Sequence, residues 1–202
     1  MMNKRLPSDD AQQLWQEYRA GDIYALATLM QCHYADLFHW GMRLQADHDF
    51  VKDCIQEVFV NLWKMQASSH SVDNVRSYLL VVLKTRILRE LSKKHRTHQF
   101  TLSDEYSFSV EFAADVQLIE EEHEIYQIRK LEYSINHLSE RQKELIYLRF
   151  YQNFSFEQIA DVMQLERQSV YNLLQKSLNS LRKNWADSAV GLLICWMNLA
   201  GC

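Results

Sequence analysis

Apolar residues recur at intervals of three and four along most of the chain, and the alternating patterns typical of strands are sparse. In the first half this spacing predicts four helices. The first begins at Ser8 and has about 12 residues, and after Gly21 a long helix capped by Asp22 runs to about residue 45. A third opens at 47 or 49 and ends near 66, and a fourth opens at 73 or 74 and reaches about 95. We expect these helices to form one compact unit.

The second half begins with a stretch of weak periodicity. Residues 98–116 combine this weak pattern with acidic side chains, so we interpret them as an extended linker. A helix then begins near Gln117, and another follows Ser139 and ends near Phe150. The sequence thus predicts an all-α protein of two small helical domains, with residues 8–97 in the first, 98–116 in the linker, 117–185 in the second and 186–202 in an apolar tail.

Residues 155–183 have the outline of a helix-turn-helix. Ser155 and Gln158 have the spacing of a capping box, and Phe154 and Ile159 lie where a hydrophobic staple would close. An apolar stripe on the second helix would pack inward, and it consists of Val170, Leu174, Leu178 and Leu181. The opposite face carries side chains suited to base edges or phosphates, namely Gln168, Asn172, Lys176 and Asn179. An ordinary two-helix hairpin is the alternative, but the outline favours nucleic acid as the partner.

The distribution of charge along the chain changes this picture. The 202 residues include four Gly and one Pro, as a helical protein would, but the formal net charge of −4 is unusual for a nucleic-acid binder. The charge is segmented, because residues 81–96 hold six basic side chains against Glu90 alone, whereas residues 97–124 hold eight acidic ones and no Lys or Arg. Two solvated surfaces would produce the same pattern.

The cysteines indicate the redox compartment of the protein, and the length of the apolar tail indicates whether it can span a membrane. No C-x-x-C spacing and no signal peptide accompany the cysteines, so we expect reduced thiols in the cytoplasm for Cys32, Cys54, Cys195 and Cys202. The apolar stretch 189–200 falls short of the roughly 17 residues that span a membrane. We expect it to dock on its own domain or on a partner, with a frayed tail as the alternative.

The third predicted helix separates an apolar side from an acidic one. Its inner side is apolar and consists of Phe50, Cys54, Ile55, Val58, Phe59 and Leu62. Its outer side is acidic with one exposed apolar residue, and it consists of Asp53, Gln56, Glu57, Val60 and Lys64. Such a face suits a partner with basic residues, although a solvated surface would look the same.

This helix resembles conserved region 2 of bacterial sigma-70-type factors, specifically of the small extracytoplasmic-function group with two domains. The family pattern of Asp, two residues, Gln-Glu, one residue, Phe and then Leu-Trp is matched by Asp53, Gln56, Glu57, Phe59, Leu62 and Trp63. The next helix, with Lys84, Thr85 and Arg86, is similar to the family's following helix, and residues 135–182 look like region 4. The resemblance spans about residues 23 to 183.

The resemblance implies a transcription initiation factor that joins RNA polymerase core, directs it to promoter DNA and melts the promoter, without catalysis of its own. The clamp helices of the largest polymerase subunit would bind Asp53, Gln56, Glu57 and Val60. The flap region of the second-largest subunit is a further expected contact, and the acidic linker would thread the channel that RNA later occupies. In the family an anti-sigma protein masks these faces, so we expect an anti-sigma partner anchored in the membrane.

The resemblance also implies two DNA sites. The minus ten element would be held by the loop 67–73 and the fourth helix, with a flipped base in a pocket and phosphates along the basic face. The candidate residues are Ser69, His70, Asn74, Arg76, Lys84, Arg86, Arg89, Lys93 and Arg96. The minus 35 element would be read in the major groove by Arg167, Gln168, Ser169, Tyr171, Asn172 and Lys176.

The second domain departs from the family pattern at several positions. Gln164 stands in the turn where the family usually has Gly, and Glu166 replaces the usual Ser or Thr cap, each at a cost below about 1 kcal/mol. Tyr171, Leu173 and Asn179 stand where relatives are often basic. We therefore expect this domain alone to bind DNA weakly, with compensation from effective concentration when both domains sit on polymerase.

The sequence contains few residue patterns that are typical of an enzyme. Glu120 and His123 make a single Glu-x-x-His, whereas a di-metal bundle needs two such pairs, and His95 and His98 lack partner cysteines. We expect no metal, no cofactor and no small-molecule substrate. Two other functions stay open, a helix-turn-helix regulator that binds duplex DNA without polymerase and an adaptor that mimics a sigma factor to trap an anti-sigma protein. The basic residues 86–96 argue against the adaptor.

Overall fold

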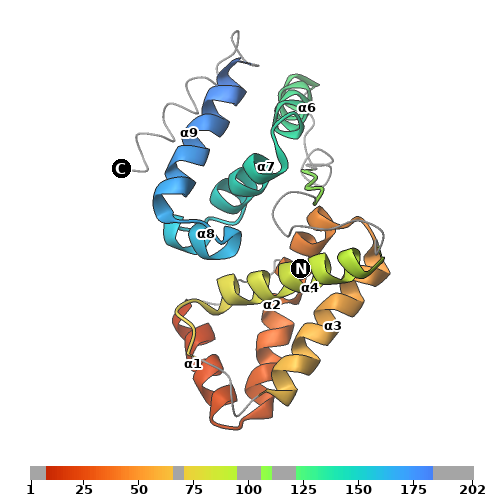
Figure 1. Cartoon of the computed structure of the whole chain (residues 1–202), viewed down its shortest axis with the longest axis vertical. Coiled ribbons are helices and arrows are strands. Elements are labelled where there is room, and N and C mark those ends of the chain that lie inside the picture. The colour runs from red at the N-terminus through yellow and green to blue at the C-terminus, as the bar shows by residue number, and fades with distance from the viewer. Residues whose placement is uncertain (1–7, 66–70, 95–105, 111–121, 184–202) are drawn as a thin grey trace. The chain divides into compact units, whose positions relative to one another are not determined.

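The structure is a computed structural model of the whole chain, and it describes residues 8–65, 71–94, 106–110 and 122–183. Within these ranges every regular element is a helix, which confirms the predicted all-α class (Figure 1). Contacts divide the chain into two compact units. Unit 1 holds helices α1 to α4, and unit 2 begins at Phe108 and holds α6, α7, α9 and most of α8.

Unit 1 contains the four helices predicted from the apolar spacing: α1 (Ser8–Arg19), α2 (Ile23–Leu44), α3 (His48–Lys64) and α4 (Val75–Lys94). The predicted caps are confirmed, since the carboxylate of Asp22 accepts the N–H of Tyr24 at 2.8 Å and that of Asp47 accepts the N–H of Phe50 at 3.1 Å. At the start of α4 it is Asn74 that caps, by accepting the N–H of Ser77 at 2.8 Å.

The core of unit 1 forms around α2, which packs against α1, α3 and α4. Fully buried side chains fill it, among them Trp15, Tyr18, Leu37, Trp40, Ile55, Leu83 and Ile87. The hydroxyl of Tyr18 donates to the carbonyl of Leu62, which ties α1 to the end of α3. The helices α2 and α3 approach each other closely at Gly41, where a Cβ atom would lie 2.5 Å from Cγ1 of Val51. These contacts fix the orientation of α3 and therefore of its outer face.

Unit 2 contains α6 (Glu122–Asn136), α7 (Glu140–Ile146), a π-helical turn η2 (Tyr147–Tyr151), α8 (Phe156–Met163) and α9 (Arg167–Lys183). The capping box of the helix-turn-helix is confirmed, because Ser155 Oγ accepts the N–H of Gln158 at 3.2 Å and Gln158 Oε1 accepts the N–H of Ser155 at 2.9 Å. The predicted stripe of Val170, Leu174, Leu178 and Leu181 is buried. The predicted start of the first helix near residue 117 lies outside the described residues.

Two features in the second half of the chain concern backbone outside the helices. Gln164 in the turn between α8 and α9 has a φ of +52°, a left-handed conformation that favours glycine, as the departure from the family pattern suggested. The other feature is a short extended segment that the sequence analysis placed in the linker. Its Phe108 and Val110 are buried, and the side-chain amide of Asn136 both accepts from the Val110 N–H and donates to the Val110 carbonyl.

Candidate functional site

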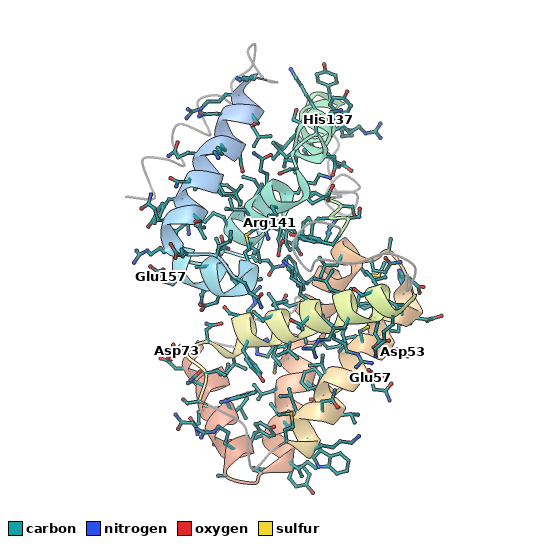
Figure 2. All side chains as sticks on the ribbon, viewed as in Figure 1. Asp53, Glu57, Asp73, His137, Arg141 and Glu157 are labelled. Carbon is teal, nitrogen blue, oxygen red and sulfur yellow. The ribbon has the colours of Figure 1, made fainter. Side chains whose placement is uncertain are left out.

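The outer face of α3 has the composition that the sequence predicted. Asp53, Gln56, Glu57 and Val60 are all exposed, and Asp53 and Glu57 project from the same side of the unit (Figure 2). The helical spacing continues to Trp63, whose side chain is 54% exposed. Trp63 belongs to the family motif but is not among the residues predicted to bind the polymerase. The signal that identified Val60, an apolar residue on an acidic face, could have identified Trp63 as well. The surface that these five residues form is called the α3 face below.

One residue of the α3 face is engaged within unit 1. The carboxylate of Glu57 forms an ion pair with the guanidinium of Arg86 on α4, and Arg86 Nη2 also lies 2.9 Å from Glu90. Arg86 thus points toward α3, and its side chain is 26% exposed. Cys54 lies buried beside these charges, and burial raises the pKa of its thiol to about 11. The sequence had assigned Glu57 to a protein partner and Arg86 to DNA, whereas the fold joins them.

A second candidate DNA residue on α4 is also held inside the unit. Arg76 Nε lies 2.9 Å from Asp36 of α2, and both side chains are largely buried, at 18% and 15% exposure. The neighbouring His33 is buried, and burial, aided by the charge of Arg76 and opposed by Asp36, lowers the pKa of its imidazole. These contacts make Arg76 part of the packing between α2 and α4.

The remaining candidates on α4 are more accessible. Lys84 is half-buried, with its ammonium 4.6 Å from the ring centroid of Tyr106, and Lys93 is exposed while paired to Glu90 at 2.7 Å. Arg89 is exposed and has no ion pair with any described residue. Ser69, His70 and Arg96 lie outside the described residues.

In unit 2 the candidate residues form two groups, one exposed on α9 and one in contact with α8. Gln168, Ser169, Asn172 and Lys176 are exposed on α9, and Gln168 Nε2 donates to Asn172 Oδ1 at 3.3 Å. Arg167 and Tyr171 instead contact α8. Arg167 Nη2 lies 2.7 Å from Glu157, and the ring of Tyr171 lies 4.2 Å from that of Phe156, centroid to centroid. Glu157 is exposed at the start of α8 (Figure 2).

The side chains exposed at these surfaces are suited to binding a nucleic acid or a protein partner. Amide, hydroxyl and ammonium groups on α9 match the donors and acceptors of base edges and phosphates, and the α3 face offers exposed carboxylates and an exposed indole ring. Across the described residues no three His, Cys, Asp or Glu side chains gather as a metal site would require. In that same part of the chain no helix is long and apolar enough to cross a membrane.

Comparison with known proteins assigns both units. Residues 29–97 match the family profile described as Sigma-70 region 2, and residues 134–183 match Sigma-70, region 4. No curated protein sequence matches the chain. Among solved structures, CnrH in complex with the cytosolic domain of CnrY is similar at a TM-score of 0.59 and 18% identity, over 89% of this chain and all of that one.

A second solved structure shares the fold. It is the sigma factor RpoE in complex with the anti-sigma factor NepR from Bartonella quintana, with a TM-score of 0.55 and 19% identity. The alignment covers 79% of this chain and 96% of that one. At such identities the likeness concerns the arrangement of the helices, so the two profile matches carry the assignment of the regions.

Proposed function

The chain belongs to the sigma-70 family and directs transcription initiation, and we propose that it has the two-region form of the extracytoplasmic-function group. We further propose which of its residues bind the polymerase and which bind the promoter. Unit 1 carries region 2, so it binds the polymerase core and the minus ten element. Unit 2 carries region 4 and reads the minus 35 element. The family implies a role without catalysis by the chain itself.

The α3 face binds the clamp helices of the largest polymerase subunit. The observation that carries this assignment is a half-exposed indole, Trp63, on the same face as Asp53, which has no ion pair with any described residue. A carboxylate without a partner is available to a basic residue of the polymerase, and an exposed aromatic ring is typical of the centre of a protein interface. Glu57 contributes less directly, because Arg86 already neutralises it.

The basic side of α4 follows the minus ten strand. Arg89 and Lys93 are exposed and separated by one helical turn, so they suit phosphate contacts along a separated strand. Arg76 and Arg86 act from inside the unit, where their ion pairs orient α4 against α2 and α3. The loop 67–73 remains the proposed site of the flipped base.

Unit 2 reads the minus 35 element with the exposed side chains of α9. Gln168 and Asn172 lie one turn apart and bond each other, so their amides are oriented together for base edges, and Lys176 is available to a phosphate. The flap region of the second-largest polymerase subunit would hold this unit in place, which compensates for its few cations.

An anti-sigma protein regulates the chain, and it acts in the cytoplasm from a membrane anchor. The structure of the sigma factor RpoE with the anti-sigma factor NepR supports an anti-sigma partner, because RpoE shares the fold of this chain. CnrH, which shares the fold too, is bound by the cytosolic domain of CnrY. A partner of this kind would cover the α3 face and so compete with the polymerase.

In vitro transcription with purified core RNA polymerase tests the proposal. We expect a promoter-dependent product when the full chain is added, and its loss on Asp53→Lys. The control is Asp10→Lys, which reverses an exposed charge on α1, a helix that contributes nothing to the α3 face. A chain that binds duplex DNA equally well without polymerase, and gives no product with it, would instead be a stand-alone regulator.

A further inference from the structure

The start of α9 is bound to the start of α8 through a charged pair that no expectation from the sequence included. The guanidinium of Arg167 lies 2.7 Å from the carboxylate of Glu157, and both side chains are more than half exposed, at 60% and 55%. Arg167 also lies over the ring of Tyr171, 5.9 Å from its centroid, and Tyr171 packs on Phe156. Of the two cations among the candidate minus 35 residues, one therefore already has an anionic partner.

The local structure explains why this carboxylate stays charged and in place. A backbone hydrogen bond and the hydroxyl of Ser155 at the helix start lower the pKa of Glu157, and Arg167 adds to the effect. Arg167 begins α9, where the helix dipole disfavours a cation, so a nearby anion relieves it. The pKa of Arg167 is raised by the Tyr171 hydroxyl and by Glu157.

A carboxylate and a DNA phosphate bind a guanidinium through the same kind of charged oxygen. Glu157 consequently competes with the DNA backbone for Arg167. Because the pair is exposed to solvent, its strength is modest, and a DNA site that offers additional contacts can displace it.

We propose that Glu157 is a specificity-determining residue of the minus 35 site, and this inference rests on the function proposed above. Glu157 keeps its ion pair with Arg167 when unit 2 binds duplex DNA of arbitrary sequence, so that Arg167 makes no phosphate contact there. At the correct sequence Gln168, Ser169 and Asn172 also bond their base partners, and Arg167 then leaves Glu157 and binds a DNA phosphate. Glu157 thereby weakens binding to wrong sequences more than binding to the right one, which is how an unfavourable contact raises specificity.

The salt dependence of binding to a duplex of arbitrary sequence measures the number of phosphates contacted. Each contact adds about −0.9 to the slope of log K against log salt, or about threefold in affinity between 50 and 200 mM. For the full chain with Glu157→Gln we expect a slope steeper than wild type by about this amount. The matched control Glu166→Gln removes a neighbouring exposed carboxylate that has no ion pair with a described residue, and its slope should stay at the wild-type value.

Three further measurements complete the test. Glu157→Gln combined with Arg167→Gln should return the slope to wild type, because the released cation is gone. Holoenzyme carrying Glu157→Gln should select from duplexes randomised in the minus 35 segment with a weaker preference than wild-type holoenzyme. Circular dichroism should show the same helical content for both single variants, since the capping box of Ser155 and Gln158 is untouched.

The outcomes separate this inference from the function on which it rests. If Glu157→Gln and Glu166→Gln have the same slope, or if the Glu157 variant selects as sharply as wild type, Glu157 does not restrain Arg167 and the inference fails. If wild-type holoenzyme selects no sequence in this segment, the proposed reading of the minus 35 element fails instead, and the slopes still decide whether Glu157 withholds Arg167 from phosphate.

Discussion

Reversal of the charge at Glu57 separates a role in folding from a role in binding. Asp53 and Glu57 lie one turn apart on the α3 face, and a face judged from the sequence would treat them alike. In the structure Glu57 is paired with Arg86, whereas Asp53 has no ion pair with a described residue. Asp53→Lys and Glu57→Lys therefore remove equal charge from the proposed polymerase interface but disturb the fold unequally.

The expected difference in stability follows from the exposure of the pair. The Glu57 side chain is 50% exposed and that of Arg86 is 26% exposed, so loss of the ion pair costs roughly 0.2–1 kcal/mol. The new ammonium would face Arg86, and two like charges 4 Å apart repel by about 1 kcal/mol in water. Together these terms lower the free energy of unfolding by about 1–2 kcal/mol. For Asp53→Lys the change should stay within about 0.5 kcal/mol.

Urea unfolding followed by circular dichroism measures the stability, and fluorescence anisotropy with labelled protein measures binding to polymerase core. Both variants should lose affinity for core, but only Glu57→Lys should unfold at lower urea concentration. Adding Arg86→Glu to Glu57→Lys should recover part of the stability and none of the core binding. Recovery would be partial because the new carboxylate faces Glu90. Equal stability of the two single variants would refute the pairing of Glu57 with Arg86.

Three further predictions concern stability, each measured as the free energy of unfolding in urea. Gly41→Ala should destabilise by up to about 2 kcal/mol, because overpacking against the buried Val51 costs about 1–3 kcal/mol and the gain in helix propensity returns about 1 kcal/mol. A variant more stable than wild type would contradict the close approach. Gln164→Gly should stabilise by up to about 1 kcal/mol, because relief of the left-handed backbone, roughly 1–2 kcal/mol, exceeds the cost of the added entropy of the unfolded chain. The control is Asn153→Gly at a φ of 55°, which should change the stability less because asparagine tolerates this conformation. His33 should make the free energy of unfolding fall as the pH drops below the ordinary histidine pKa of 6.5, because the unfolded chain binds the proton before the buried imidazole does. The slope should reach up to about 1.4 kcal/mol per pH unit. His33→Leu should remove this slope, and an unchanged slope would exclude His33 as its source.

Much of the fold was predictable because its signals are local. A cap depends on residues within one turn, so Asp22, Asp47 and Ser155 could be recognised as helix starts before any packing was known. An amphipathic period likewise assigns each residue to an inner or outer side of its own helix. The buried stripe of α9 and the exposed α3 face follow from that period alone.

The limits of local signals appear in the extended segment near Phe108. A short run with apolar residues at alternate positions has no helical period, so it was assigned to the linker together with its acidic neighbours. Its burial depends on Asn136 and Glu140, which accept its backbone N–H groups from the end of α6 and the start of α7. No pattern within the segment identifies those acceptors.

The sequence by itself determined the helical class, the two regions and the faces of the helices, because periodicity and capping act between residues close in the chain. Only the tertiary structure decided which outward charges remain available to a partner. Arg76, Arg86 and Arg167 all lie on basic stretches or candidate reading faces, yet each is paired with a carboxylate from another helix. An ion pair forms only when two charged atoms come within a few ångströms, and that separation is set by how whole helices pack against one another.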